Sequence, residues 1–331
     1  MVASQSDTLA VTSGVVSPMV ESTLSIKQIL ACYYPYLAGC RAAIAIDLAA
    51  APMGGILTEY FERGKMLRPL LLFAATSAVG GNLTAVIPAA HALELLHGAS
   101  LIHDDIIDRS KERRCGLSLH LRVGVGPAIV LGDYLILRSQ ILLAQMKSAR
   151  ALEAMQVLNR CAEDCCRGQV EELVTARENT EDGYFSIIRR KTASPFVAAA
   201  TVGGILGDGR EHEIEALKTY ALNLGICFQI RDDELDLTDD ASPQKALDRA
   251  TLPFIYLQNH GSSGASRKYR QLQKGGANRS ELLTFLCAEG VIDRLETVKQ
   301  FHLRQALEAG QCFRNSAEMS AIAQHAINRE A

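Results

Sequence analysis

The chain has 331 residues, of which 48% are hydrophobic, and its formal net charge is −3. This length and apolar content are sufficient for a large buried core. Nucleic acid is excluded as the main partner, because neutralising phosphates requires a surplus of Lys and Arg that this chain lacks. The nine cysteines follow no spacing typical of zinc sites or of a disulfide framework, so we expect a cytoplasmic location.

We expect no targeting signal in the N-terminal segment. Residues 1–22 contain no Lys or Arg, unlike the basic region of a signal peptide or an Arg-rich transit peptide. We predict a disordered tail there, followed by a single domain over residues 23–331. We expect no transmembrane segment, because no apolar run reaches the roughly 18 residues that suggest a membrane span.

Most of the remaining chain repeats apolar residues at helical spacing, and strand signals are nearly absent. Gly, Pro and polar clusters such as PMGG, VGGN and NHGSSGASRK divide the helical segments. We therefore predict an all-α fold, a single bundle of about ten helices around a central cavity. The predicted helices cover residues 24–50, 66–79, 85–109, 127–147, 150–177, 181–205, 211–238, 250–259, 279–289 and 291–329.

The stretch SLIHDDIIDRSKERR, residues 100–114, places three aspartates within five positions. On a helix, Asp104 and Asp108 lie one turn apart on the same face, and Asp105 lies about 100° around it, close enough to share a metal cluster. Carboxylates this close repel one another and need a cation to stay ionised. Mg²⁺ suits such ligands, since it prefers oxygen and bridges carboxylates to substrate phosphates. For one isolated motif, a solvated acidic helix end is the alternative.

The same spacing returns in FQIRDDELDL, which supplies Asp232, Asp233 and Asp236 after a second apolar segment. An acidic surface turn rarely occurs twice with identical spacing on two helices of core character. Two such triads, facing each other across a cavity, can hold several Mg²⁺ ions and a diphosphate between them. The repetition therefore favours the metal site over the solvated helix end.

With these motifs the sequence resembles the trans-isoprenyl diphosphate synthases, the polyprenyl synthetase family, over residues 60–259. The first motif resembles the family pattern DDxxDxxxxRR, and GICFQIRDDELD resembles its second aspartate-rich region. The resemblance implies a homodimeric prenyltransferase that uses about three Mg²⁺ ions per active site to join isopentenyl diphosphate (IPP) to an allylic diphosphate. It implies as metal ligands Asp104, Asp105, Asp108, Asp232, Asp233 and Asp236.

The resemblance also implies the groups that bind the two diphosphates. GKMLRP resembles a segment that binds IPP, which implies Lys65, Arg68, His97 and Arg114 as its ligands through charge-assisted hydrogen bonds. Arg113 matches the family arginine that contacts the allylic diphosphate.

The segment RRKTASPF resembles a Lys-Thr pair of the family. Lys191 would hold the allylic diphosphate, and the dipole of Thr192 would face the developing carbocation. Gln229 would lie nearby, although a satisfied core amide is its alternative. Catalytic roles would thus fall on Asp104, Asp105, Asp108, Lys191, Thr192, Gln229 and Asp232.

Two segments depart from the family pattern. RRCGLS replaces the usual RRGxPT, with Cys115 for glycine and Leu117 for proline. The loop after Asp236 is short and lacks its glycines, and Lys245 and Arg249 are the nearest matches to two phosphate-covering lysines.

In this family the product length depends on how far the growing tail extends beneath the first motif. The residues one turn before Asp104 are Ala99 and Ser100, both small, so the pocket is expected to stay open and to admit products longer than farnesyl. GASLIHDDIID resembles long-chain synthases, so we predict a long prenyl product, with geranylgeranyl as the rival. Candidates for a deeper floor are Tyr134, Leu135 and Leu137.

Other functions stay open at this point. A terpene cyclase would ionise a similar substrate without adding IPP, but it has no use for the IPP-binding residues. A non-catalytic subunit of a heteromeric synthase has no need for six intact aspartates. A peripheral membrane contact through the apolar product is a further expectation.

Overall fold

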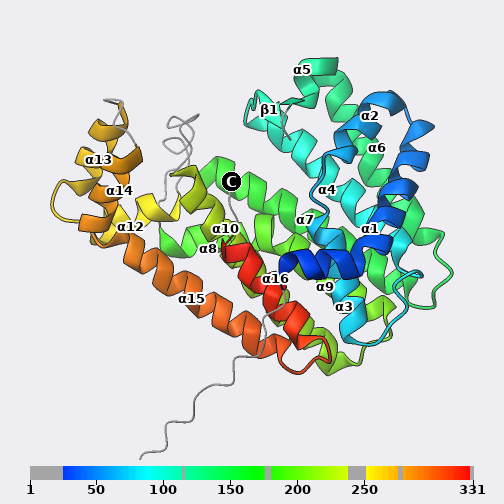
Figure 1. Cartoon of the computed structure of the whole chain (residues 1–331). Helices are drawn as coiled ribbons and strands as arrows, with labels where there is room; N and C mark the ends of the chain where they lie inside the picture. Colours follow the sequence, from blue (N-terminus) through cyan, green and yellow to red (C-terminus); the bar gives the residue numbers. More distant parts are fainter. Residues whose placement is uncertain (1–24, 114–115, 176–179, 238–250, 275–278, 329–331) are drawn as a thin grey trace, which may run out of the picture.

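The computed structural model describes residues 25–113, 116–175, 180–237, 251–274 and 279–328 (Figure 1). Helices make up almost all of these ranges, which confirms the predicted all-α fold. Strands β1 (Glu112–Arg113) and β2 (Gly116–Leu117) form a short antiparallel hairpin. The predicted tail, residues 1–22, lies outside the described residues.

The described ranges contain sixteen helical elements, of which one is a π-helix. They are α1 (Ile26–Ala49), α2 (Gly54–Glu62), α3 (Leu67–Ala78), α4 (Ile87–Ile107), α5 (Leu119–Val123), α6 (Val125–Ala144), α7 (Ala151–Thr175), α8 (Glu181–Ile188), the π-helix η1 (Arg189–Ala193), α9 (Ser194–Leu206), α10 (Glu211–Asp236), α12 (Leu252–His260), α13 (Ala265–Lys274), α14 (Arg279–Ala288), α15 (Val291–Gly310) and α16 (Ser316–Asn328).

The larger of two apolar clusters lies among α1, α3, α4, α6, α7 and α9. Small residues let these helices approach closely: a Cβ added at Gly203 of α9 would collide with the Leu72 carbonyl of α3. Leu71, Leu72 and Phe73 in α3 are fully buried, so this helix is central. Helices α3 and α9 are apolar and buried on most faces, as expected for elements enclosed by others.

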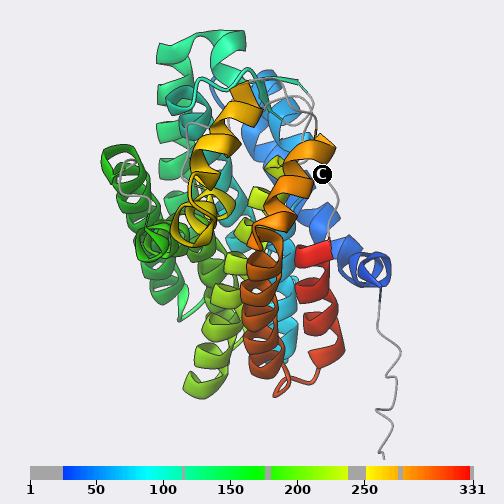
Figure 2. The ribbon, with the colours of Figure 1, turned by 90° about the vertical axis from the view of Figure 1, so that its left-hand side faces the viewer.

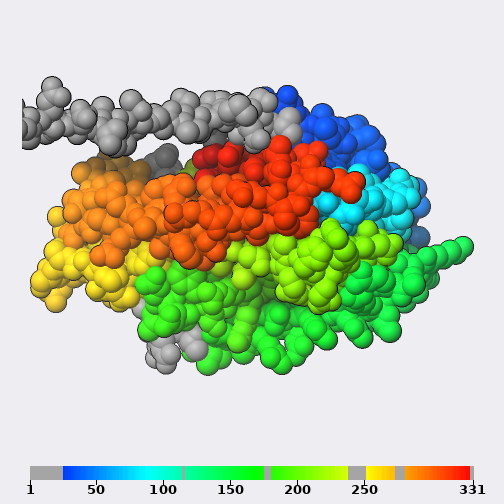
Figure 3. All heavy atoms as spheres, turned by 90° about the horizontal axis from the view of Figure 1, so that it is seen from below, coloured from blue at the N-terminus to red at the C-terminus, as the bar shows by residue number. Residues whose placement is uncertain are grey.

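The second cluster lies at the other end of the molecule, where α12, α13 and α14 pack against α8, α10 and α15. Figure 1 shows α12, α13 and α14 on the left, α1–α6 on the right and α7–α10 between them. Helix α15 runs beside α10 and α16, as the side view in Figure 2 and the view from below in Figure 3 show. Lys299 of α15, 7% exposed, joins Glu234 of α10 through contacts of 2.8 and 2.9 Å.

Several predicted boundaries were wrong. The segment predicted as one helix over residues 181–205 is α8, η1 and α9, because the backbone widens into a π-helix at residues 189–193. The segment 291–329 is interrupted between α15 and α16. Helices α2, α5 and α13 were not predicted; the first two are short, and α13 is highly polar, with Ala265 and Tyr269 as the buried residues among its described side chains.

Two helices, α1 and α6, are long and apolar enough to cross a membrane by length and composition alone. Small and polar residues interrupt both helices, so neither contains a continuous apolar run of the length used above. A polar group also joins them across α4: Arg138 Nε of α6 donates to Asp47 of α1 at 2.8 Å, and His91 Nε2 of α4 lies 3.3 Å from the same carboxylate. This contact is that of helices packed within one bundle.

Candidate active site

The first aspartate motif lies at the carboxyl end of α4. Asp104 is partly buried, Asp105 is 1% exposed, and Asp108 is exposed and caps the helix. The free carbonyls and the negative end of the helix dipole add to the negative charge of these carboxylates. Positive charge from elsewhere must therefore stabilise this end of α4.

Arg113 on β1 supplies part of that charge. Its Nε donates to both Asp105 carboxylate oxygens at 2.9 and 3.1 Å, and its Nη2 also donates to Asp105. The hydrogen bonds and charge of Asp105 raise the pKa of Arg113, against the opposing effect of burial. Both Asp105 oxygens are thus turned to the guanidinium, and its role as a metal ligand stays a prediction.

The second motif lies at the carboxyl end of α10 and repeats the burial of the first. Asp232 is partly buried, Asp233 is 4% exposed and Asp236 is exposed. In each motif the first and last aspartates, one helical turn apart, are therefore the accessible ones. The middle aspartate points into the protein in both.

Asp233 has neutral hydrogen-bond donors around it. Gln229 Nε2 donates to Oδ1 at 2.9 Å, while the Tyr184 hydroxyl and the Leu252 backbone N–H donate to Oδ2 at 2.9 and 3.0 Å. Burial raises the pKa of Asp233 to about 6, although the three hydrogen bonds oppose this shift. Both Asp233 oxygens thus already accept hydrogen bonds from protein groups, and its role as a metal ligand also stays a prediction.

The described residues contain no group of three His, Cys, Asp or Glu side chains placed to hold a metal ion unaided. The accessible oxygens instead come as two separate pairs, Asp104 with Asp108 and Asp232 with Asp236. This donor set fits Mg²⁺, which keeps several waters and takes one or two carboxylates together with substrate phosphates. Zinc sites instead draw mainly on cysteine and histidine side chains.

A cationic cluster lies at the start of α3. Arg68 Nη1 donates to His97 Nε2 of α4 at 2.9 Å, and its guanidinium lies 5.1 Å from the ring centre of Phe196 of α9. Burial lowers the pKa of Arg68, while the charges of Glu94 and Asp232 oppose the shift. Arg68 thus lies within the electrostatic influence of both α4 and α10. Lys65, also predicted for IPP binding, is exposed just before α3.

The predicted Lys-Thr pair lies on the π-helix η1. Lys191 Nζ donates to Glu172 Oε2 of α7 at 2.7 Å, and Thr192 Oγ1 donates to Gln229 Oε1 of α10 at 2.7 Å. The structure therefore brings Thr192 and Gln229 together, as predicted. The predicted residues Arg114, Lys245 and Arg249 lie outside the described residues.

Sequence reasoning missed Glu172 and Tyr184. Glu172 lies three residues after Gln169 on an amphipathic helix, and nothing in its spacing indicates that it faces Lys191. Tyr184 lies seven residues before Lys191, about two turns of a regular helix, and this spacing would place both side chains on the same helix face. The π-helix between them alters the relative orientation of their side chains, so the spacing alone would have misplaced Tyr184.

The predicted chain-length positions lie within α4. Ala99 is fully buried in the larger apolar cluster, and Ser100 Oγ donates to the His97 carbonyl at 2.8 Å. Of the candidates for a deeper floor, Leu135 is fully buried, whereas Leu137 is 60% exposed. Leu137 is therefore excluded, because its side chain faces away from the core.

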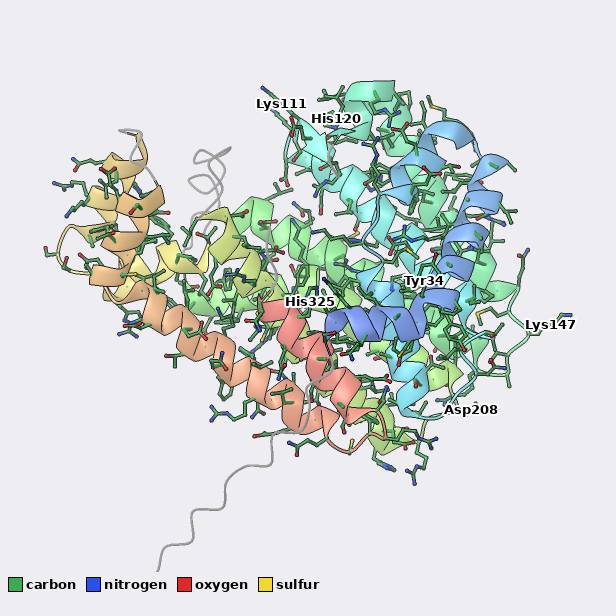
Figure 4. The ribbon with its side chains drawn as sticks, viewed as in Figure 1. Tyr34, Lys111, His120, Lys147, Asp208 and His325 are labelled. Atoms are coloured by element: carbon green, nitrogen blue, oxygen red, sulfur yellow. The ribbon has the colours of Figure 1, made fainter. Side chains whose placement is uncertain are left out.

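A pocket of about 270 Å³ lies between α2, the hairpin and α5. Glu59 bridges two arginines across it, with Oε1 3.1 Å from Arg63 and Oε2 2.6 Å from Arg122. Figure 4 shows Lys111 and His120 at this end of the molecule. Arg113 also lines the pocket, so the pocket adjoins the first motif. Its lining residues are Glu59, Tyr60, Arg63, Arg113, Gly116, Leu117 and Arg122.

These features define an all-α protein with two aspartate motifs at the ends of two core helices. Residues 52–282 match the polyprenyl synthetase family model, so the chain belongs to this family. The matched region contains both motifs and the α3 cationic cluster.

Similar curated proteins are prenyl diphosphate synthases. A geranylgeranyl diphosphate synthase of Methanosarcina mazei is 39% identical over 56% of this chain, and the match spans 57% of that relative's length. An octaprenyl diphosphate synthase of Escherichia coli is 31% identical over 72% of this chain and 75% of its own. The chain thus resembles synthases of both shorter and longer products.

Solved structures show the same fold. A polyprenyl synthase from Caulobacter crescentus, complexed with calcium and isoprenyl diphosphate, has a TM-score of 0.81 at 26% identity, covering 93% of this chain and 99% of that one. A decaprenyl diphosphate synthase from Rhodobacter capsulatus has a TM-score of 0.79 at 26% identity, covering 92% and 99%.

Proposed function

We propose that the chain is a Mg²⁺-dependent prenyltransferase that condenses IPP head to tail with an allylic diphosphate. Its product would be an all-trans polyprenyl diphosphate longer than farnesyl. The observation that carries the proposal is the matched pair of motifs, each with two accessible aspartates one turn apart at a helix carboxyl end. Arg68, beside His97 and under the influence of Asp232, adds a site for a second diphosphate.

The residues divide the work between the two substrates. Asp104, Asp108, Asp232 and Asp236 would hold Mg²⁺, which when bound supplies positive charge to the allylic diphosphate as its C–O bond breaks. Lys191 would leave Glu172 to contact the same diphosphate. Lys65, Arg68 and His97 would bind the diphosphate of IPP and hold its double bond against the allylic carbon.

The remaining steps need an enclosed apolar site. The IPP double bond attacks the allylic cation and forms a new C–C bond. The resulting cation then loses a proton to the released diphosphate, which leaves a new double bond. Water must be excluded, because it would quench the cation. Phe196 and Phe228, whose ring centres are 5.1 Å apart, provide an apolar wall beside Arg68.

The product length would be set beneath the first motif. The small side chains of Ala99 and Ser100 favour a product longer than farnesyl, and the octaprenyl synthase relative supports a long chain. The geranylgeranyl synthase relative supports the rival of a shorter product. A peripheral membrane contact would follow from a long apolar product.

The assembly would be a homodimer in the cytoplasm, with a second copy of the chain covering α6. This helix exposes several large apolar side chains to solvent, which is typical of an interface. Its packing against α4 leaves the opposite face uncovered in the single chain. The exposed residues are Val125, Ile129, Val130, Leu137 and Ile141, at 42–65% exposure.

The proposal is tested by incubating the purified chain with labelled IPP, Mg²⁺ and dimethylallyl, geranyl or farnesyl diphosphate. Mass analysis should show products longer by whole isoprene units. Cyclised products from a long substrate, without IPP incorporation, would establish the cyclase alternative. Activity that appears only when a second, different subunit is added would establish the heteromeric alternative.

A further inference from the structure

A chain of hydrogen bonds crosses the second motif from η1 to the start of α12. Thr192 Oγ1 donates to Gln229 Oε1 at 2.7 Å, and Gln229 Nε2 donates to Asp233 Oδ1 at 2.9 Å. The Tyr184 hydroxyl and the Leu252 N–H complete it by donating to Asp233 Oδ2 at 2.9 and 3.0 Å. The chain begins at a partly exposed hydroxyl and ends at a carboxylate that is 4% exposed.

The Asp233 carboxylate determines which group donates and which accepts in each of these hydrogen bonds. An ionised Asp accepts hydrogen bonds and cannot donate, whereas a Gln amide has one donating and one accepting end. Asp233 therefore turns the NH₂ of Gln229 toward itself and the carbonyl toward Thr192. The Thr192 hydroxyl then donates its hydrogen bond to that carbonyl. Toward other partners it can therefore present only the lone pairs of its oxygen.

We infer that Asp233 and Tyr184 are positioning residues that set this polarity, so that Thr192 presents its oxygen, and not its proton, to the allylic cation. The inference rests on the proposed function. A hydroxyl oxygen directed at developing positive charge stabilises it, while a proton directed there opposes it, and such fixed dipoles are effective in a site that excludes water. Asp233 acts through Gln229 and Thr192, without contact to the metal.

Tyr184 and Leu252 hold Asp233 in place for this role. Both donors converge on one oxygen, leaving the other for Gln229. They come from α8 and from the first residue of α12, so three helices fix the carboxylate. This arrangement explains why the middle aspartate of the second motif is buried while Asp232 and Asp236 are not.

The decisive experiment exchanges the acid and the amide. In Asp233→Asn the side chain gains an NH₂ group, the Gln229 amide turns over, and Thr192 is left with its proton free to face the substrate. The double variant Gln229→Glu/Asp233→Asn restores the original direction, because the new carboxylate at position 229 accepts from both Thr192 and the new amide at position 233. The net charge of the pair is unchanged. We expect Asp233→Asn to lower kcat by about tenfold to a hundredfold. The double variant should recover at least about tenfold of that loss.

The Mg²⁺ dependence separates positioning from metal binding. If Asp233 positions Gln229, the Mg²⁺ concentration for half-maximal rate and the KM for IPP stay within about twofold in both variants, because neither binding site is altered. A rise in the Mg²⁺ requirement of about tenfold in Asp233→Asn, or a double variant no faster than the single one, would overturn the inference. A wild-type chain that does not incorporate IPP would instead refute the proposed function.

Tyr184→Phe tests the same arrangement with a matched control. It removes one donor to Asp233, and we expect a smaller fall in kcat of about twofold to tenfold with KM values unchanged. The control is Tyr256→Phe, which removes a 3.0 Å hydrogen bond from α12 to Glu181 of α8 in the same apolar cluster. Equal losses of kcat in both variants would show a merely structural role for Tyr184.

Discussion

The two aspartate motifs have the same sequence spacing and the same burial pattern, but their middle aspartates are stabilised differently. Asp105 is paired with the guanidinium of Arg113, whereas Asp233 takes its hydrogen bonds from an amide, a hydroxyl and a backbone N–H. An opposite charge compensates the loss of hydration on burial, while neutral donors compensate it only in part. The raised pKa of Asp233 follows from this difference.

The difference suggests a division of labour. The ion pair of the first motif ties the hairpin to α4 and so fixes where Arg113 lies. The neutral network of the second motif ties α8 and α12 to α10 and fixes the direction of hydrogen bonds to Thr192. With the same DDxxD pattern, the middle aspartate of the first motif thus forms an ion pair, whereas that of the second sets the direction of a hydrogen-bond network.

The largest expected effect is loss of turnover when an accessible aspartate is removed from either motif. Asp104→Ala and Asp232→Ala should each lower kcat by about a thousandfold or more, because each removes a carboxylate proposed to hold Mg²⁺ against the diphosphate. Steady-state kinetics over a range of Mg²⁺ concentrations would check this. A variant that keeps wild-type turnover would show that its motif is not a metal site.

The next effect is on stability and should differ between the motifs. Asp105→Asn leaves the Arg113 charge without its partner and should lower the free energy of unfolding by about 1–3 kcal/mol, reduced from the fully buried case because the Arg113 side chain is 30% exposed. Asp233→Asn should be neutral or stabilising, since burial already disfavours its charged form. Urea unfolding of both variants gives the comparison, and equal losses would contradict it.

Acid should destabilise the fold through two buried histidines. Burial lowers the pKa of His91, beside α1 and α6, and of His302, on α15, from 6.5 to about 4. The unfolded chain therefore takes up these protons first, so stability is lost as pH falls from about 6.5 toward 4, by up to about 3 kcal/mol for each histidine.

Thermal unfolding at several pH values tests this sign. His91→Gln and His302→Gln should each flatten the dependence of Tm on pH between 6.5 and 4, whatever they do to Tm at neutral pH. His302 Nδ1 lies 2.7 Å from Asn223 Oδ1, and glutamine retains an amide donor for that contact. An unchanged pH dependence in both variants would show that other groups control acid unfolding.

Much of the fold could be predicted from the sequence, because long amphipathic or apolar segments determine helices locally. The central helices α3, α4, α6, α7 and α10 begin and end close to their predicted bounds. The break at residues 189–193 could not be predicted, because one widened turn inside a long helical segment is determined by tertiary packing and leaves no local pattern in the sequence. Helix α13 depends on two buried residues in a polar segment, too weak a signal to detect.

The site was predictable where one helix determines it. Asp104 and Asp108 share a face because they lie one turn apart. Asp105, turned about 100° from them, could equally have faced the metal or the core, and the choice depends on the packing around α4. Partners from other elements, such as Tyr184 for Asp233, depend on the tertiary arrangement and leave no local pattern.

The smallest effect concerns product length and compares equivalent positions on α4 and α10. Ala99 and Cys227 lie five residues before the first aspartate of each motif, and both are at most 1% exposed. Cys227 Sγ lies 3.5 Å from the Lys299 carbonyl, so it faces α15 and not the space beneath the motifs.

If the growing tail runs along α4, Ala99→Leu should shift the products toward shorter chains, while Cys227→Leu should leave the distribution unchanged. Both changes enlarge a buried side chain and should lower stability by about 1–3 kcal/mol, so any difference in product mass reports on the path of the tail and not on general damage to the core. Shortening by Cys227→Leu alone would place that path along α10.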